Sequence, residues 1–147
     1  MNRSLASIAC LSLLLPSLVA VAGDSPQELR HEMMEDVGGA AKTIGAMLKG
    51  EKAFDAQAAN AALDVWAEAA WDFGKLFPEG SETGFDTEAK STIWTDRASF
   101  DKALAEFKQQ ADAAVAANPQ TLAELQPAAG AVFKTCKSCH EGYRVDD

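Results

Sequence analysis

Two cysteines and a histidine lie close together near the C-terminus, as Cys136, Cys139 and His140. This C-x-x-C-H spacing is the attachment motif of c-type haem, in which two thiols add across the vinyl groups of the porphyrin. On a helix, residues three apart share a face, so both sulfurs would reach one porphyrin edge. The imidazole of His140 would then be the proximal ligand of the iron. The motif therefore predicts one covalently bound haem c.

Other interpretations of these residues fit the sequence less well. A thioredoxin-like dithiol would need a strand before the motif, and no strand pattern precedes Cys136. A structural zinc site needs four ligands, whereas the chain after residue 23 offers only the motif and a distant His31. A third alternative is a structural or metal-binding helical bundle that carries no haem.

The first 23 residues have the composition of a secretory signal peptide. Arg3 supplies the positive start, residues 5–15 are apolar, and Ala20-Val21-Ala22 matches a cleavage site. The alternative, a transmembrane anchor, is disfavoured because the apolar run is short and interrupted. We therefore expect export to the periplasm and a single domain over residues 24–147.

The chain is acidic, with 13 Lys and Arg against 22 Asp and Glu and a net charge of −9. Loss of Arg3 with the signal would leave 12 against 22, a net charge of −10. Such a surface disfavours binding to nucleic acid or to anionic membranes. It suits solubility, or protein partners with basic docking patches.

Capping signals and apolar periodicity predict four helices and no strands. The helices are expected at about 26–49, 56–73, 95–117 and 122 to the C-terminus, with a short turn at 91–94. Ser25 and Thr121 begin capping boxes, and Asp55 is a third N-cap. Gly74 is expected to end the second helix, and Pro127 should kink or restart the fourth.

The connections between these helices predict their arrangement. Residues 75–90 contain Pro78, Gly80 and Gly84 and form a surface loop that is long for a bundle turn. The other connections are short, so the economical fold is an all-α, antiparallel four-helix bundle. Trp66 is expected in its core and Trp71 on its surface.

The haem motif lies on the last helix and is followed by Glu141-Gly142-Tyr143-Arg144. This placement resembles the class II cytochromes c, the cytochrome c′ superfamily, and the likeness covers residues 26–145. Further shared residues are Gly50-Glu51-Lys52-Ala53-Phe54-Asp55, Leu76-Phe77-Pro78, Ile93-Trp94, Arg97 and Phe100-Asp101. The resemblance implies a carrier of electrons between redox proteins rather than an enzyme, and it allows a homodimer.

Within the family that the sequence resembles, one residue of the first helix lies on the distal side of the iron. The type of this residue decides whether the iron has a sixth ligand from the protein. High-spin cytochromes c′ place a bulky apolar residue there and leave a five-coordinate iron that binds NO or CO. The low-spin cytochrome c-556 branch places a methionine there. Arg30 and Met34 form an R-x-x-x-M pattern similar to that branch. We therefore expect His140 and Met34 as axial ligands, with the five-coordinate form as the alternative.

The helical wheel supports Met34 independently of the resemblance. At about 100° per residue, one face within about 40° collects Arg30, Met34, Gly38, Ala41 and Gly45. Beyond the first two, this face has small side chains, against which a porphyrin could lie. Met33 falls on the apolar side of the helix with the bundle core, and His31 is expected to be exposed.

Several other side chains are candidates for contacts around the haem. Arg30 and Arg144 could pair with the propionates, because guanidinium groups match carboxylates. Aromatic candidates for lining the porphyrin are Phe133, Tyr143 and Trp94. A small basic docking area could be formed by Lys134, Lys137 and Arg144.

Overall fold

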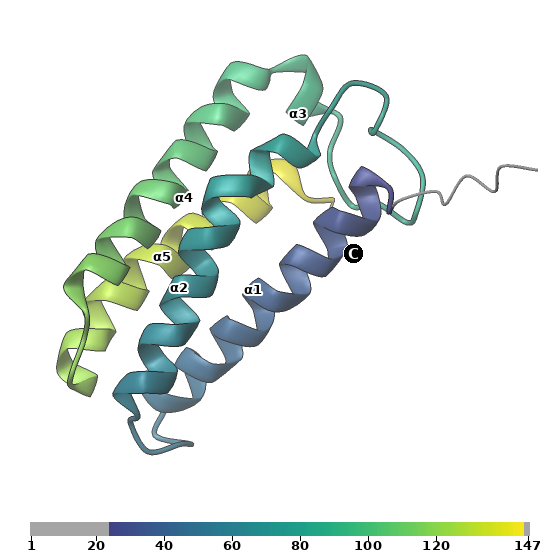
Figure 1. The fold of residues 1–147 in the computed structure, drawn as a ribbon. Coiled ribbons are helices and arrows are strands. Elements are labelled where there is room, and N and C mark those ends of the chain that lie inside the picture. The colour runs from purple at the N-terminus through teal and green to yellow at the C-terminus, as the bar shows by residue number, and fades with distance from the viewer. Residues whose placement is uncertain (1–23, 146–147) are drawn as a thin grey trace, which may run out of the picture.

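The computed structural model describes residues 24–145 of the chain. Its elements are α1 (Pro26–Leu48), α2 (Ala56–Asp72), the 3₁₀ helix η1 (Phe73–Leu76), α3 (Thr92–Thr95), α4 (Arg97–Ala117) and α5 (Leu122–Tyr143). Figure 1 shows the four long helices running alternately up and down the molecule. α1 packs on α2, α2 on α4, and α4 on α5. The predicted all-α four-helix bundle is confirmed.

Two capping boxes fix where α1 and α5 begin. The Ser25 hydroxyl accepts from the Glu28 backbone N–H at 3.3 Å, and the Glu28 carboxylate accepts from the Ser25 N–H at 2.7 Å. Thr121 and Glu124 make the same pair of bonds at 3.3 and 3.1 Å. These side chains satisfy N–H groups that have no partner inside a helix. Both predicted starts are confirmed.

The C-terminal end of α2 differs from the prediction. Gly74 does not end the helical segment, because η1 carries it on to Leu76. A Cβ atom at Gly74 would lie 2.9 Å from Leu104 Cδ1. The glycine therefore allows η1 to approach α4 without displacing the end of the Leu104 side chain, and it does not act as a stop.

The short turn predicted at 91–94 is present as α3, and Asp96 separates it from α4. The Asp96 carboxylate accepts from the Ser99 N–H at 3.3 Å and caps α4. α4 ends at Asn118, which has a left-handed φ of 42° and precedes Pro119. The predicted stop at Asn118-Pro119 is confirmed, and the start lies two residues later than expected.

α5 runs through Pro127 as one helix and does not restart there. The proline removes the N–H that would bond to the carbonyl of Ala123. Both residues are exposed, so water can satisfy that carbonyl. The lost bond is therefore tolerated on the outer side of the helix.

The bundle core is built around Trp66, which is fully buried. Its indole N–H donates to the carbonyl of Val37 on α1 at 3.1 Å. The ring packs edge-on against Phe133 of α5, with centroids 5.1 Å apart. Trp71, in contrast, is 64% exposed. The predicted positions of both tryptophans are confirmed.

A second hydrophobic cluster closes one end of the bundle. It joins Phe77, Ile93 and Phe100 with partly buried neighbours that include Trp94 and Tyr143. The rings of Phe77 and Phe100 have centroids 4.8 Å apart, and those of Phe100 and Tyr143 lie 5.1 Å apart. The connection between η1 and α4 is therefore packed onto the bundle rather than free.

None of the helices within residues 24–145 is long and apolar enough to cross a membrane. The signal peptide predicted for residues 1–23 lies outside the described residues.

Candidate haem site

The last helix presents both cysteines of the motif toward the bundle. Cys136 and Cys139 lie one turn apart on α5, are half-buried and carry free thiols. Cys136 packs against the main hydrophobic core. Burial raises the pKa of both thiols, which keeps them protonated at neutral pH. Their shared face agrees with attachment to a single porphyrin edge.

His140 follows directly and lies at the exposed rim of this face. Partial desolvation, and next the positive charge of Arg144, lower the pKa of its imidazole. A neutral imidazole is the form that ligates a metal. The site therefore offers a nitrogen donor beside the two thiols.

Met34 lies on α1, at the same end of the bundle as His140. Because α1 and α5 are antiparallel, the first turns of α1 and the last turns of α5 meet at this end, as Figure 1 shows. Met34 is partly buried against the main core, and so is its neighbour Met33. His31 is exposed, as predicted, with its imidazole 3.6 Å from the Glu35 carboxylate.

The face of α1 that carries Met34 continues with small residues, of which Gly38 is one turn away. A Cβ atom added at Gly38 or Gly45 would meet nothing within 4 Å. α1 and α5 touch much less than the other neighbouring long helices. A groove of about 530 Å³ lies farther along, at the C-terminal half of α1, with Ala41, Gly45 and Phe133 among its lining residues. α1 and α5 are therefore loosely packed against each other, which leaves room for an apolar group between them.

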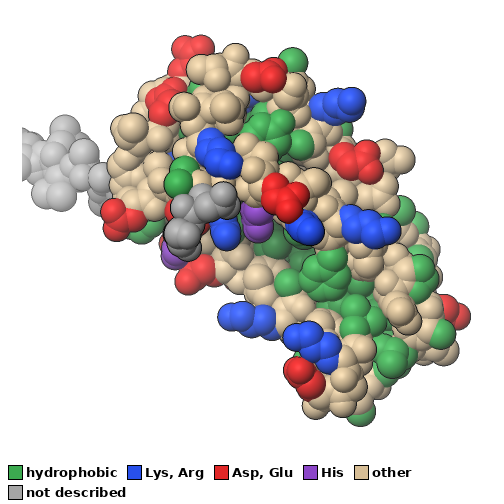
Figure 2. Space-filling view, turned by 180° about the vertical axis from the view of Figure 1, so that it is seen from behind, with side chains coloured by type: hydrophobic (Ala, Val, Ile, Leu, Met, Phe, Trp, Pro, Cys, Tyr) green, Lys and Arg blue, Asp and Glu red, His purple; other side chains and the backbone are tan. Residues whose placement is uncertain are grey.

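Figure 2 shows hydrophobic side chains gathered in a hollow on the side of the molecule where α5 lies. Lys and Arg side chains border this hollow. Phe133 is the predicted lining residue that reaches the groove. The other two, Tyr143 and Trp94, belong to the second cluster at the end of the bundle.

Arg30 is a buried cation, only 5% exposed. Its guanidinium lies 4.7 Å from the ring centroid of Phe77 and donates four hydrogen bonds to residues 76–87. Burial lowers its pKa, and the negative charge of Glu82 acts in the opposite direction. None of the ion pairs formed within residues 24–145 involves this side chain. A buried guanidinium without a directly paired carboxylate is one to which an added anion would be attracted.

Arg144 lies just past the end of α5 and is exposed. Its Nε lies 3.7 Å from a carboxylate oxygen of Glu88, and its backbone N–H donates to the carbonyl of His140 at 3.0 Å. Arg144 is thus held near the histidine. An exposed pair at this distance is weak and leaves the guanidinium open to another anion.

The sequence patterns did not indicate Ser81, Thr87 or Lys90, which lie between η1 and α3. Ser81 and Thr87 accept hydrogen bonds from Arg30, and Lys90 donates to the carbonyl of Glu141 at 2.9 Å. Such ordinary loop residues belong to no motif and follow no periodicity. Only the folded structure shows that Ser81 and Thr87 contact α1 and that Lys90 contacts α5.

The chain matches the family model described as Cytochrome C' over residues 25–144. The protein belongs to the cytochrome c′ family. It is 38% identical to cytochrome c′ of Rhodopseudomonas palustris over 145 residues, which cover 99% of this chain and 98% of the relative. It is 33% identical to cytochrome c-556 of the same organism, over 90% of this chain and 91% of the relative.

The fold agrees with the sequence comparison. The solved structure of cytochrome c′ from Rhodopseudomonas palustris superimposes with a TM-score of 0.80 at 35% identity, covering 85% of this chain and 99% of that one. Cytochromes of this family carry one covalently attached haem c. The relatives include both cytochrome c′ and cytochrome c-556, so the family is one of haem proteins that carry electrons or bind a small ligand.

Proposed function

We propose that this cytochrome is a periplasmic one-electron carrier whose haem is attached to Cys136 and Cys139 and ligated by His140 and Met34. The bound haem supplies an iron that gains and loses one electron. The observation that carries the proposal is the partly buried thioether of Met34, at the His140 end of the bundle and one turn before the open space at Gly38. Two protein ligands would leave no open position for a gas.

The two side chains would also favour fast electron exchange. A His and Met pair keeps the same coordination in both oxidation states, so little protein movement accompanies the electron. The thioether sulfur favours the ferrous state and raises the reduction potential relative to two histidines. The packed core beneath, centred on Trp66, would hold both helices in place.

Arg30 and Arg144 are the proposed partners of the haem propionates. Arg30 combines burial with the absence of a carboxylate within ion-pair distance among residues 24–145, and a propionate would supply one. Arg144 is exposed and its pair with Glu88 is loose, so its contribution would be smaller.

The proposed partners are redox proteins with an acidic face. Lys134, Lys137 and Arg144 are exposed on the C-terminal half of α5 and just beyond it, close to the motif. They form a local basic area on a chain with a net charge of −9. Such an area would orient an acidic partner toward the haem edge and accelerate encounter at low salt.

The test of the proposed ligand is Met34→Ala, with Met33→Ala as the matched control. The wild-type ferric protein should be low-spin and show the weak far-red sulfur-to-iron band. Met34→Ala should lose this band, become high-spin and bind CO, because the sixth position is then open. Met33→Ala removes the same atoms one residue away and should keep the band.

A high-spin wild-type spectrum with rapid CO binding would overturn the carrier proposal. It would favour the alternative, a five-coordinate cytochrome c′ that binds NO or CO. A band retained by Met34→Ala and lost in Met33→Ala would move the ligand to the neighbouring methionine.

A further inference from the structure

The segment of residues 77–91, here called the strap, is bonded to the first turns of α1. Arg30 Nη1 donates to the carbonyl of Leu76, next to the strap, at 3.1 Å, and to Ser81 Oγ at 3.1 Å. Its Nη2 donates to the Ser81 carbonyl at 2.8 Å and to Thr87 Oγ1 at 3.3 Å. Gln27 adds a bond from Nε2 to the Thr83 carbonyl at 2.7 Å.

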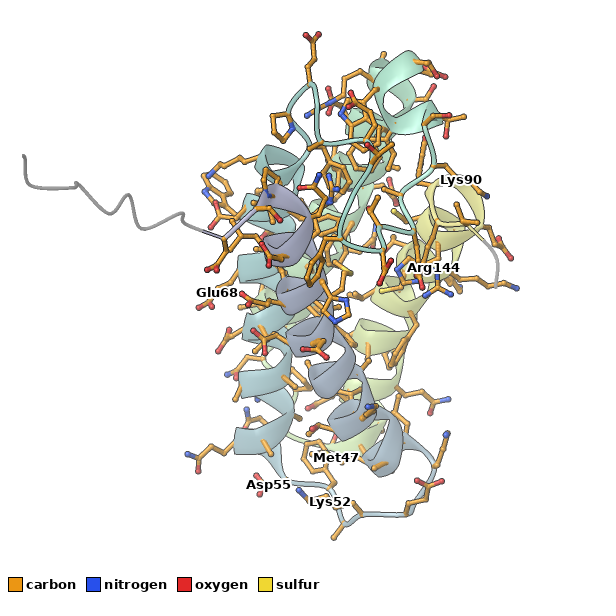
Figure 3. The ribbon with its side chains drawn as sticks, turned by 90° about the vertical axis from the view of Figure 1, so that its right-hand side faces the viewer. Met47, Lys52, Asp55, Glu68, Lys90 and Arg144 are labelled. Carbon is orange, nitrogen blue, oxygen red and sulfur yellow. The ribbon has the colours of Figure 1, made fainter. Side chains whose placement is uncertain are left out.

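The same strap is bonded to the last turn of α5. The Lys90 backbone N–H donates to the carbonyl of Tyr143 at 2.9 Å, and the Val145 N–H donates to the carbonyl of Glu88 at 2.7 Å. Lys90 Nζ donates to the Glu141 carbonyl at 2.9 Å. Figure 3 shows Lys90 and Arg144 at this end of α5.

These bonds connect the two helices that carry the proposed axial ligands. Arg30 lies one turn before Met34 on the same face of α1, and Glu141 is adjacent to His140. Direct contact between α1 and α5 is the weakest among the neighbouring long helices, and glycine leaves space beside Met34. Within residues 24–145, the strap is therefore the principal connection between α1 and α5 at this end of the bundle.

We propose that the strap sets the separation of α1 and α5 and thereby keeps Met34 within bonding distance of the iron. Ser81, Thr87 and Lys90 are then positioning residues for the axial methionine. This inference rests on the proposed His140 and Met34 ligation. It adds a specific prediction, that loosening a loop remote in sequence opens the iron to exogenous ligands.

The physical basis is the cost of leaving a buried guanidinium unsatisfied. Removal of the Ser81 and Thr87 hydroxyls takes away two of the four acceptors of Arg30. The carbonyls of Leu76 and Ser81 remain, but unsatisfied buried donors are costly. Arg30 would therefore be drawn from the strap toward a propionate or toward water and carry the first turns of α1 with it. The sulfur of Met34 would then dissociate more often, and a competing ligand would bind with higher apparent affinity.

The test uses the mature, haem-loaded protein carrying Ser81→Ala and Thr87→Val together. The apparent CO affinity of the ferrous form should rise about tenfold, as expected for the loss of two hydrogen bonds, and the far-red band of the ferric form should weaken. The control carries Ser99→Ala and Thr43→Val, the same chemical changes away from the strap. Thr87→Ser keeps the hydroxyl and should behave as wild type.

The α5 side of the strap is tested separately by Lys90→Met, which removes the bond to the Glu141 carbonyl. A smaller rise in CO affinity is expected, because two backbone bonds remain there. CO affinity and far-red band equal to wild type in both strap variants would overturn the inference, even if the proteins were less stable.

Amide hydrogen exchange distinguishes failure of the strap from failure of the proposed function. A wild-type protein without the far-red band would refute methionine ligation, but the strap would still be expected to restrain residues 27–36. Faster exchange of those amides in the Ser81→Ala/Thr87→Val variant than in the control supports the strap. Equal exchange in the two proteins refutes it.

Discussion

Trp66 illustrates how single polar atoms are satisfied inside this bundle. Its indole N–H has one partner, the Val37 carbonyl, and its ring contacts Phe133, three residues before Cys136. No buried side-chain nitrogen or oxygen within residues 24–145 lacks a hydrogen-bond partner. Trp66 therefore joins α1, α2 and α5 beneath the candidate haem site.

Trp66→Phe should lower the free energy of unfolding by about 1–3 kcal/mol. The smaller ring leaves a cavity and deprives the Val37 carbonyl of its side-chain donor. Urea unfolding of the haem-loaded protein measures the change. Trp71→Phe is the control and should cost less than about 1 kcal/mol, because Trp71 is exposed and a phenyl ring can still face Lys108, whose Nζ lies 4.6 Å from the indole centroid. Equal losses in the two variants would contradict this account.

Residue types and spacing were sufficient to predict a covalently bound haem and the exposure of His31. Ligation of the iron by Met34 stays a proposal. They could not predict the surroundings of Arg30. Its acceptors lie 46 to 57 residues away in the sequence, in a segment without periodicity. Contacts of that kind depend on how a loop folds over the bundle, which no local pattern encodes.

At the scale of elements, side-chain caps determine where most helices begin. Thr121 caps α5 through a bond from the Glu124 N–H, whereas Ser91 precedes α3 without a side-chain cap bond. Thr121 and Ser91 both carry a hydroxyl at a helix start, but only the hydroxyl of Thr121 accepts a capping hydrogen bond.

Thr121→Ala should destabilise the protein by about 1 kcal/mol, the usual effect of losing an N-cap. Ser91→Ala should change stability by less than about 0.5 kcal/mol, because no cap bond is lost. Thermal unfolding of both haem-loaded variants is the measurement. Visible spectra should stay unchanged, since Thr121 lies at the opposite end of α5 from the motif. A larger loss for Ser91→Ala would refute the assignment.

The caps explain why helix boundaries were predicted closely at Ser25, Asp55 and Thr121. The end of α2 was predicted to within one residue, but the stop assigned to Gly74 was wrong, because a glycine can serve either a left-handed cap or a close contact. Gly74 serves the contact, with Leu104 as the neighbour. That choice is made by the packing of α4, which the local sequence does not reveal.

At the scale of the whole molecule, cations collect near the candidate haem site although the chain is acidic. Lys137 lies 3.7 Å from Glu141, and Arg144 lies 3.7 Å from Glu88, both in exposed pairs. Pairs of this kind are weak, so the side chains can turn toward a partner. The local excess of positive charge would act on encounter rates rather than on stability.

Charge reversal tests this basic area. The triple variant Lys134→Glu, Lys137→Glu and Arg144→Glu should be oxidised severalfold more slowly by hexacyanoferrate(III), a small anion, with a weaker dependence on ionic strength. The control variant Lys75→Glu, Lys102→Glu and Lys108→Glu has the same net charge but is altered away from α5. Stopped-flow absorbance measures both rates. Equal rates in the two variants would rule out a local docking role.

The two ends of the bundle differ in how they are closed. At one end, marked by Lys90 and Arg144 in Figure 3, the strap folds over α1 and α5. At the opposite end, Lys52 marks the short turn between α1 and α2. Residues 51–53 are exposed and lie far from the strap. A chromophore or an electrode linker attached at this turn would leave the other end facing outward. The molecule could thus be immobilised in one orientation, with its electron-exchanging end toward the solution.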